Sequence, residues 1–216
     1  MREIPLGDAP QRETAVTRAM LDGEQPTPVT AQNVQARIRG ARMWNWSNSA
    51  RALFIQTSDM SERAVGYTTI GGDLEGALAV IANVPKTVVV ALLERLHERF
   101  GFEGIALSLG TVPGPELAAN QSAEHDLMPF PVLDACLYLY AGEKLSAAEL
   151  GGALQTLFPH GPPAMLAADA QRFVELFSKS IFKWVQAPIS LHVGTLDLER
   201  ERALQLPVIQ RNEWEG

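Results

Sequence analysis

The sequence has few of the side chains that several common classes of protein need. One cysteine and four histidines occur among its 216 residues, and these five side chains show no paired ligand spacing. No apolar run approaches the ~18 residues that span a membrane, and residues 1–5 lack the basic start and apolar stretch of a signal peptide. We therefore expect a cytoplasmic protein with neither an internal disulfide nor a zinc site, and with no membrane partner.

Basic residues are also in the minority. The chain carries 18 Lys and Arg against 25 Asp and Glu, a formal net charge of −7. This balance argues against nucleic acid as a partner, because no broad basic surface is available. A few local Arg and Lys residues would still suffice to bind an anionic small molecule. The G-x-S-x-G, Walker and G-x-G-x-x-G motifs are all absent, which excludes several common enzyme classes.

What is present is typical of a globular domain. The chain is 46% hydrophobic and 20% charged, and its length fits one core. Cys136 lies in an apolar stretch, 132–137, and is more typical of a core residue than of a nucleophile.

The N-terminal third predicts a helix, a strand and a helix start. Residues 1–29 are polar and contain four prolines, which indicates a lead-in segment with one helix-compatible stretch at 13–21. Thr30 is a suitable cap for a helix over 31–39 that can extend to Trp46. Residues 52–57 predict a strand, and Asp59 with Glu62 has the spacing of a capping box directly after it. A strand end followed by a helix start is a favourable place for an anion.

The rest of the chain alternates between long loops and helices. Glycines at four positions predict a loop over 66–85, and prolines and glycines predict another over 110–131. Helical periodicity predicts helices over 86–100, 132–140, 146–157 and 165–185, and Ser146 with Glu149 forms a second capping-box pattern. We expect three parts: the lead-in segment 1–29, a domain over 30–188 and a tail over 189–216.

Four residues are candidates for a site, each with a structural alternative. Arg37 and Arg39 could clamp a phosphate or carboxylate, although a solvated helix face is the commoner explanation for two arginines at this spacing. Glu62 could hold Mg²⁺ or only cap a helix. Lys86, in a first helical turn, is unfavourable for the helix dipole, which favours a functional reason for its presence.

Longer stretches of the sequence form a recognisable series of motifs: N-V-Q-A-R-I-R (33–39), Q-T-S-D-M-S-E-R-A-V-G-Y-T-T-I-G-G-D (56–73), V-P-K-T (84–87), P-E-L (115–117), Gln121, Glu124 and L-M-P-F-x-V-L-D (127–134). In this order and spacing they resemble the NAD synthetase family over roughly residues 30–188. The resemblance is closest in style to the synthetase domain of glutamine-dependent members.

The resemblance implies a fold and a reaction. The fold would be α/β, an adenine-nucleotide-hydrolase-like (Rossmann-like) parallel sheet with helices, incomplete at its N-terminus and rich in helices in its C-terminal half. The reaction would be ATP-dependent adenylylation of deamido-NAD, followed by amidation with ammonia to give NAD, AMP and pyrophosphate. Mg²⁺, a homodimer and a glutaminase domain or subunit as nitrogen source belong to the same expectation.

The resemblance also implies roles for individual residues. ATP would be bound by Thr57, Lys86 and Gly114, and Mg²⁺ by Glu62. Deamido-NAD would be bound by Arg37, Ile70, Ala77, Phe182 and Lys183.

One part of the family pattern is absent from this sequence. The pyrophosphate loop S-G-G-x-D-S, which the family has upstream of the matched region, occurs nowhere in the chain. Its backbone N–H groups would bind phosphates and its Asp a metal. The sequence therefore leaves two hypotheses open: an NAD synthetase ligase, or a catalytically inactive truncated homologue that serves as a dinucleotide-binding or dimerisation module.

Overall fold

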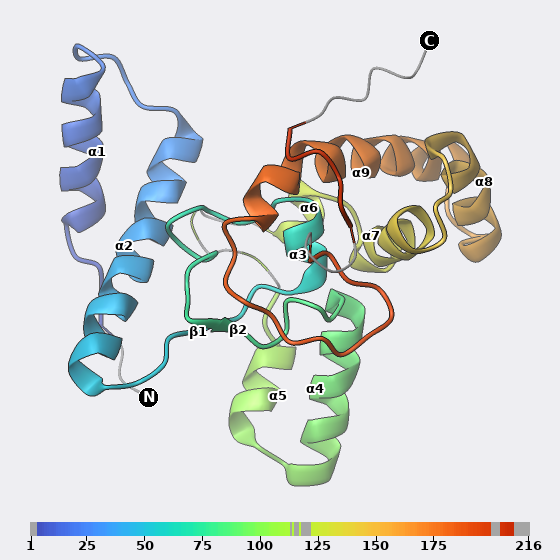
Figure 1. Cartoon of the computed structure of the whole chain (residues 1–216), viewed down its shortest axis with the longest axis horizontal. Coiled ribbons are helices and arrows are strands. Elements are labelled where there is room, and N and C mark those ends of the chain that lie inside the picture. Colours follow the sequence, from blue (N-terminus) through green and yellow to red (C-terminus); the bar gives the residue numbers. More distant parts are fainter. Residues whose placement is uncertain (1–3, 113, 115–116, 118–121, 200–203, 210–216) are drawn as a thin grey trace.

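A computed structural model describes residues 4–112, 114, 117, 122–199 and 204–209. Helices surround a small parallel sheet of two strands, β1 (Ile55–Gln56) and β2 (Leu78–Ala79), as Figure 1 shows. Ile55 is paired with Leu78 and Gln56 with Ala79, and Ala79 forms a further parallel bridge with Ser190 of the C-terminal segment. The α/β class with a helix-rich C-terminal half, expected from the sequence, is confirmed.

The C-terminal half contains most of the hydrophobic core. Its helices are α7 (Phe130–Leu137), the π-helical turn η1 (Tyr138–Gly142), α8 (Ala147–Leu157) and α9 (Pro163–Trp184). Apolar residues recur every three or four positions along α9, so one stripe of that helix faces the core. Its fully buried members include Phe173, Phe177 and Ile181, and Tyr140 packs edge-on against both phenylalanines. Cys136 is buried in the same core, as predicted.

Two helices form the N-terminal part and pack against each other: α1 (Ala9–Met20) and α2 (Pro28–Ala50). The lead-in segment thus contains a longer helix than its sequence suggested. The prediction of a cap at Thr30 was wrong, because α2 begins after Thr27, whose side chain accepts the Thr30 N–H. Pro28 suits the first helical position, where no N–H is needed.

A glycine inside α2 marks a close approach of the next segment. Gly40 is buried, and a Cβ at this position would lie 3.1 Å from the carbonyl oxygens of both Gly71 and Gly72. Gly40 does not end the helix, since α2 continues for ten further residues. Its missing side chain lets the loop after α3 pack directly on α2.

The helix pair α4 (Lys86–Phe100) and α5 (Glu103–Leu109) projects from the body in Figure 1. Neither helix buries a residue. The ends of α4 match the prediction, including Gly101 in the left-handed conformation after its last turn. The sequence pattern missed α5, because no capping side chain marks its start.

Other boundaries also differ from the sequence predictions. The strand predicted over 52–57 is only two residues long, the loop predicted over 66–85 contains β2, and the loop over 110–131 contains α6 (Ala123–Asp126). Both capping boxes are confirmed, at the start of α3 (Met60–Ala64) and at the start of α8. Within the described residues, no helix has the length and apolar composition needed to cross a membrane.

Candidate functional site

The site begins where β1 ends and α3 starts. Asp59 caps α3: its Oδ1 accepts the Glu62 N–H at 3.0 Å, and Glu62 Oε2 accepts the Asp59 N–H at 3.2 Å. The Met60 N–H donates to Val84 O at 3.0 Å, which fixes this turn against the segment before α4. The sequence therefore places Thr57 and Glu62 on either side of a rigid strand-to-helix turn.

Three charged side chains meet at this turn: Asp59, Glu62 and Lys86, which we name the charge cluster. Lys86 Nζ lies 2.5 Å from Asp59 Oδ2 and 2.8 Å from Glu62 Oε1. Burial and the Glu62 charge raise the pKa of Asp59 to about 7, although the Lys86 ammonium opposes this shift. Burial lowers the pKa of Lys86, but the charges of Asp59 and Glu62 outweigh it and the net pKa is raised. The lysine is therefore a stable cation shared between two carboxylates.

The start of α4 is fixed from the helical half. Asp134 on α7 accepts hydrogen bonds from the Ser61 hydroxyl and from both the N–H (2.8 Å) and the hydroxyl (2.7 Å) of Thr87. The Lys86 N–H in turn donates to Ser61 Oγ at 2.8 Å, and Lys86 Nζ lies 5.3 Å from the centre of the Phe130 ring. Contacts from α7 and α3 thus fix the position of Lys86 at the start of α4.

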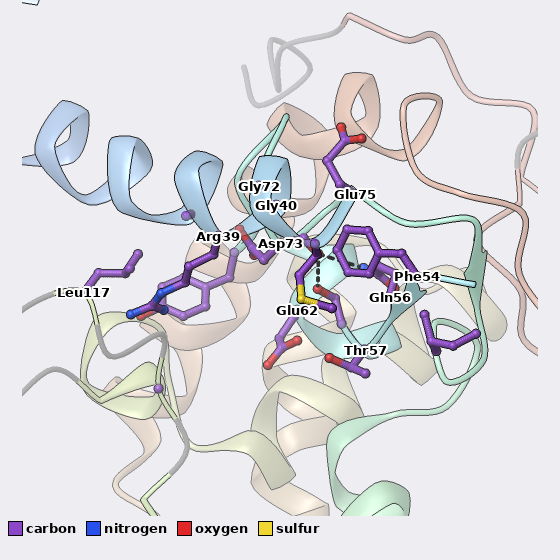
Figure 2. Close-up of a pocket in the computed structure, with 16 residues that line it drawn as sticks. Arg39, Gly40, Phe54, Gln56, Thr57, Glu62, Gly72, Asp73, Glu75 and Leu117 are labelled. Atoms are coloured by element: carbon purple, nitrogen blue, oxygen red, sulfur yellow. Dashed lines mark hydrogen bonds between the residues drawn. The ribbon is translucent and has the colours of Figure 1, made fainter. Parts of the chain in front are cut away.

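A first cavity of about 370 Å³, drawn in Figure 2, has Glu62 of the charge cluster in its wall. Of the residues predicted to bind ATP and metal, Thr57, Gly114 and Glu62 line it. Arg39 of α2 lines the same cavity, although the resemblance implied no ligand for this residue. Lys86 is adjacent to this cavity through its contact with Glu62.

A second cavity of about 300 Å³ lies between α2, the loop after α3 and α9, and Arg37, Ile70 and Lys183 line it. Arg37 Nε donates to Ile70 O at 3.1 Å. Lys183 Nζ donates to Gly66 O at 2.6 Å and Thr68 O at 2.7 Å. Burial lowers the pKa of Lys183, and the Asp73 carboxylate opposes that shift.

Two of the predicted deamido-NAD residues line neither cavity. The Ala77 N–H donates to Phe54 O at 2.8 Å, beside the sheet. Phe182 is 38% exposed on α9, next to Lys183. Their roles stay predictions.

The two cavities share three lining residues: Tyr67, Asp73 and Leu117. The Tyr67 hydroxyl donates to Asp126 Oδ2 at 2.5 Å, which ties this shared wall to α6. In the sequence, Tyr67 and Asp73 stand out only as part of the motif 56–73 that carries the resemblance. Their spacing gives no sign that they separate two cavities. Pro115, Glu116 and Gln121, which also carry the resemblance, lie outside the described residues.

The donor set fits Mg²⁺ but not a metal held by the protein alone. Within the described residues, no group of three or more His, Cys, Asp or Glu side chains could hold a metal ion. Mg²⁺ commonly takes one or two carboxylates together with substrate phosphates. Glu62, a carboxylate on the wall of the first cavity, can supply one such ligand.

The first cavity lies at the carboxyl end of the parallel strand β1, which is where open α/β proteins commonly bind ligands. The model of the NAD synthase family matches residues 10–157 of this chain. Because that match covers more than half of the sequence, the chain belongs to the NAD synthase family.

Similar proteins agree with this assignment. The glutamine-dependent NAD(+) synthetase of Aquifex aeolicus is 40% identical over 162 residues, which cover 74% of this chain and 26% of the relative. The glutamine-dependent NAD(+) synthetase of Thermotoga maritima is 31% identical over 193 residues, which cover 89% of this chain and 32% of the relative. This chain thus spans about a quarter to a third of the length of these curated relatives.

Solved structures confirm the fold. The glutamine-dependent NAD(+) synthetase from Cytophaga hutchinsonii superposes with a TM-score of 0.79 and 26% identity, over 93% of this chain and 32% of that one. The NMN synthetase from Francisella tularensis superposes with a TM-score of 0.58 and 18% identity, over 88% of this chain and 65% of that one. At this identity the similarity shows the fold alone. The expected adenine-nucleotide-hydrolase-like α/β fold is confirmed.

Proposed function

We propose that the protein is an NAD synthetase-type ligase in which the first cavity binds ATP and the second binds deamido-NAD. The observation that carries this proposal is that the two cavities adjoin, sharing Tyr67, Asp73 and Leu117. A reaction between two large nucleotides needs their reacting groups side by side while their other parts lie in separate places. Two adjoining cavities provide that arrangement.

The reaction is written in two steps. A carboxylate oxygen of deamido-NAD attacks the α-phosphorus of ATP, and the bond to the β-phosphate oxygen breaks so that pyrophosphate leaves. Ammonia then attacks the acyl carbon, AMP leaves with the electron pair of the broken C–O bond, and the nitrogen gives up a proton to solvent. No protein nucleophile is required, which is consistent with Cys136 being buried.

The chain's own residues bind and orient the two anions. Arg37, which lines the second cavity, suits a phosphate or carboxylate of deamido-NAD, and Lys183 adds a second positive charge there. Thr57 offers a hydroxyl to ATP in the first cavity, while Glu62 would hold Mg²⁺. Mg²⁺ bound there would neutralise charge on the ATP phosphates.

The test is NAD formation by the purified chain with deamido-NAD, ATP, Mg²⁺ and ammonium, with AMP release followed and the product confirmed by mass. Steady turnover is the expected result. Arg37→Met should weaken deamido-NAD binding, whereas Arg95→Met, which removes an exposed arginine of α4 that pairs with Glu98, should not. Equal deamido-NAD affinity in both variants would contradict the site.

A second candidate is a dinucleotide-binding or dimerisation module without ligase activity, for which the second cavity with Arg37 would suffice. In that case deamido-NAD binds and depends on Arg37, but no product forms. Glutamine in place of ammonium, with a glutaminase present, tests the nitrogen source. Light scattering tests the proposed homodimer.

A further inference from the structure

Asp59 has an unusual position within the charge cluster. It is 1% exposed, and among the described residues no hydrogen-bond donor besides the Lys86 ammonium reaches its Oδ2. Capping α3 uses only Oδ1, so a neutral acceptor would serve that purpose equally well. The second oxygen and the charge of Asp59 are therefore left for Lys86.

Glu62, unlike Asp59, is partly exposed to the first cavity. Its side chain is 22% exposed and lines the first cavity, yet Oε1 lies 2.8 Å from the same ammonium. Two carboxylates and one ammonium leave one net negative charge at the cavity wall. A lysine paired with Glu62 alone would neutralise that carboxylate and compete with any cation that approaches it.

We propose that Asp59 is a positioning residue that holds the Lys86 ammonium and so keeps the Glu62 carboxylate available to a divalent cation in the first cavity. The inference rests on the proposed function, in which Glu62 binds the cation that accompanies ATP. Asp59 touches neither the cation nor the nucleotide. Its effect passes entirely through Lys86.

A double-mutant cycle tests this pathway. Asp59→Asn keeps the cap and the side-chain volume but removes the charge, and it is made both in the wild-type chain and in Lys86→Met. The readout is Mn²⁺ affinity in the presence of a saturating non-hydrolysable ATP analogue, measured by water-proton relaxation.

We expect Asp59→Asn to weaken Mn²⁺ binding about tenfold in the wild-type background. In the Lys86→Met background the same change should have an effect within about twofold, since the competing ammonium is gone. An equal loss in both backgrounds would mean that Asp59 acts directly on the cation, and an unchanged affinity in both would mean that it does not act at all. Either result overturns the inference.

Two controls separate this test from folding and from the proposed function. Asp8→Asn, at an exposed position before α1 where Asp8 pairs with Arg12, should leave Mn²⁺ binding unchanged. Asp59→Asn should unfold in one cooperative transition above the temperature of the titrations, which shows that the variant is folded when its Mn²⁺ affinity is measured. A wild-type chain that binds no Mn²⁺ with the nucleotide would overturn the proposed ATP site itself. Wild-type binding that Asp59→Asn leaves intact would overturn only the role of Asp59.

Discussion

The helical half from α7 to α9 differs sharply from the region around β1 and β2. The helical half buries Leu133, Leu150 and Phe173 completely. The region around the sheet is different: β1 and β2 are together only four residues long, and the neighbouring helices α4 and α5 contain no buried residue. Most of the buried core thus lies in the helical half, while the first cavity and all but the Lys183 wall of the second lie outside it.

Specific hydrogen bonds from the helical half fix the position of the loops around the cavities. Lys183 of α9 fixes the loop after α3 through two carbonyl oxygens, and Asp134 of α7 fixes the start of α4. The site therefore consists of loops held by a helical support. Functional loops on a rigid support are a common arrangement, because loops tolerate the polar groups that a core excludes.

The largest effect should come from Phe173→Ala in the helical half. Removing a ring that is 0% exposed leaves a cavity, and we expect a loss of about 3–5 kcal/mol in the free energy of unfolding, measured by urea denaturation. Leu92→Ala on α4, where the side chain is 48% exposed, should change it by no more than about 0.5 kcal/mol. Similar losses for both would remove the contrast between the regions.

The reactivity of the Cys136 thiol is a second test of whether reagents in solvent can reach the core of the helical half. Burial, followed by the charge of Asp169, raises the pKa of its thiol from 9.0 to about 12. At pH 8 the reactive thiolate fraction should therefore be about a thousandfold lower than that of an unperturbed thiol. Modification by a disulfide reagent should be very slow in the native chain and fast in guanidinium. Fast native labelling would show that this core opens readily.

Gly72→Ala tests the contact between α2 and the site loop. An added Cβ would lie 2.9 Å from the Ala36 Cβ and 3.0 Å from its carbonyl carbon, so backbone must shift. We expect a loss of about 1–3 kcal/mol in the free energy of unfolding and weaker ligand binding in both cavities. Gly104→Ala on α5 meets nothing within 4 Å and should be neutral or stabilising. The opposite order would mean that the loop adapts freely to α2.

The smallest effect should come from Lys183→Met, which removes the link from α9 to the loop. Two carbonyl oxygens lose their donor, and we expect a loss of about 1–2 kcal/mol in thermal or urea unfolding. Deamido-NAD affinity should fall as well. Lys179→Met, four residues earlier and paired only across the helix surface with Glu175, serves as the control and should change neither quantity. A variant as stable as this control would show that the loop does not depend on α9.

The sequence by itself determined the long helices, two capping boxes and the family. Apolar stripes on α9 and start signals such as Asp59 with Glu62 depend on residues close together in the chain, so they can be read locally. The family motifs also identified Arg37, Glu62, Lys86 and Lys183 as candidates. Local patterns located β1 within 52–57 but overestimated its length, and they missed β2, because a two-residue strand exists only through its partner.

Only the tertiary structure decided how those candidates combine. It placed Lys86 between Asp59 and Glu62, although 24 residues separate Lys86 from Glu62 in the chain. It also placed six of the predicted residues in the walls of two cavities that meet at Tyr67, Asp73 and Leu117, and left Lys86, Ala77 and Phe182 outside both walls. The physical reason is that ion pairs and cavity walls form between segments distant in sequence, and their geometry is set by how α7 and α9 pack in the core.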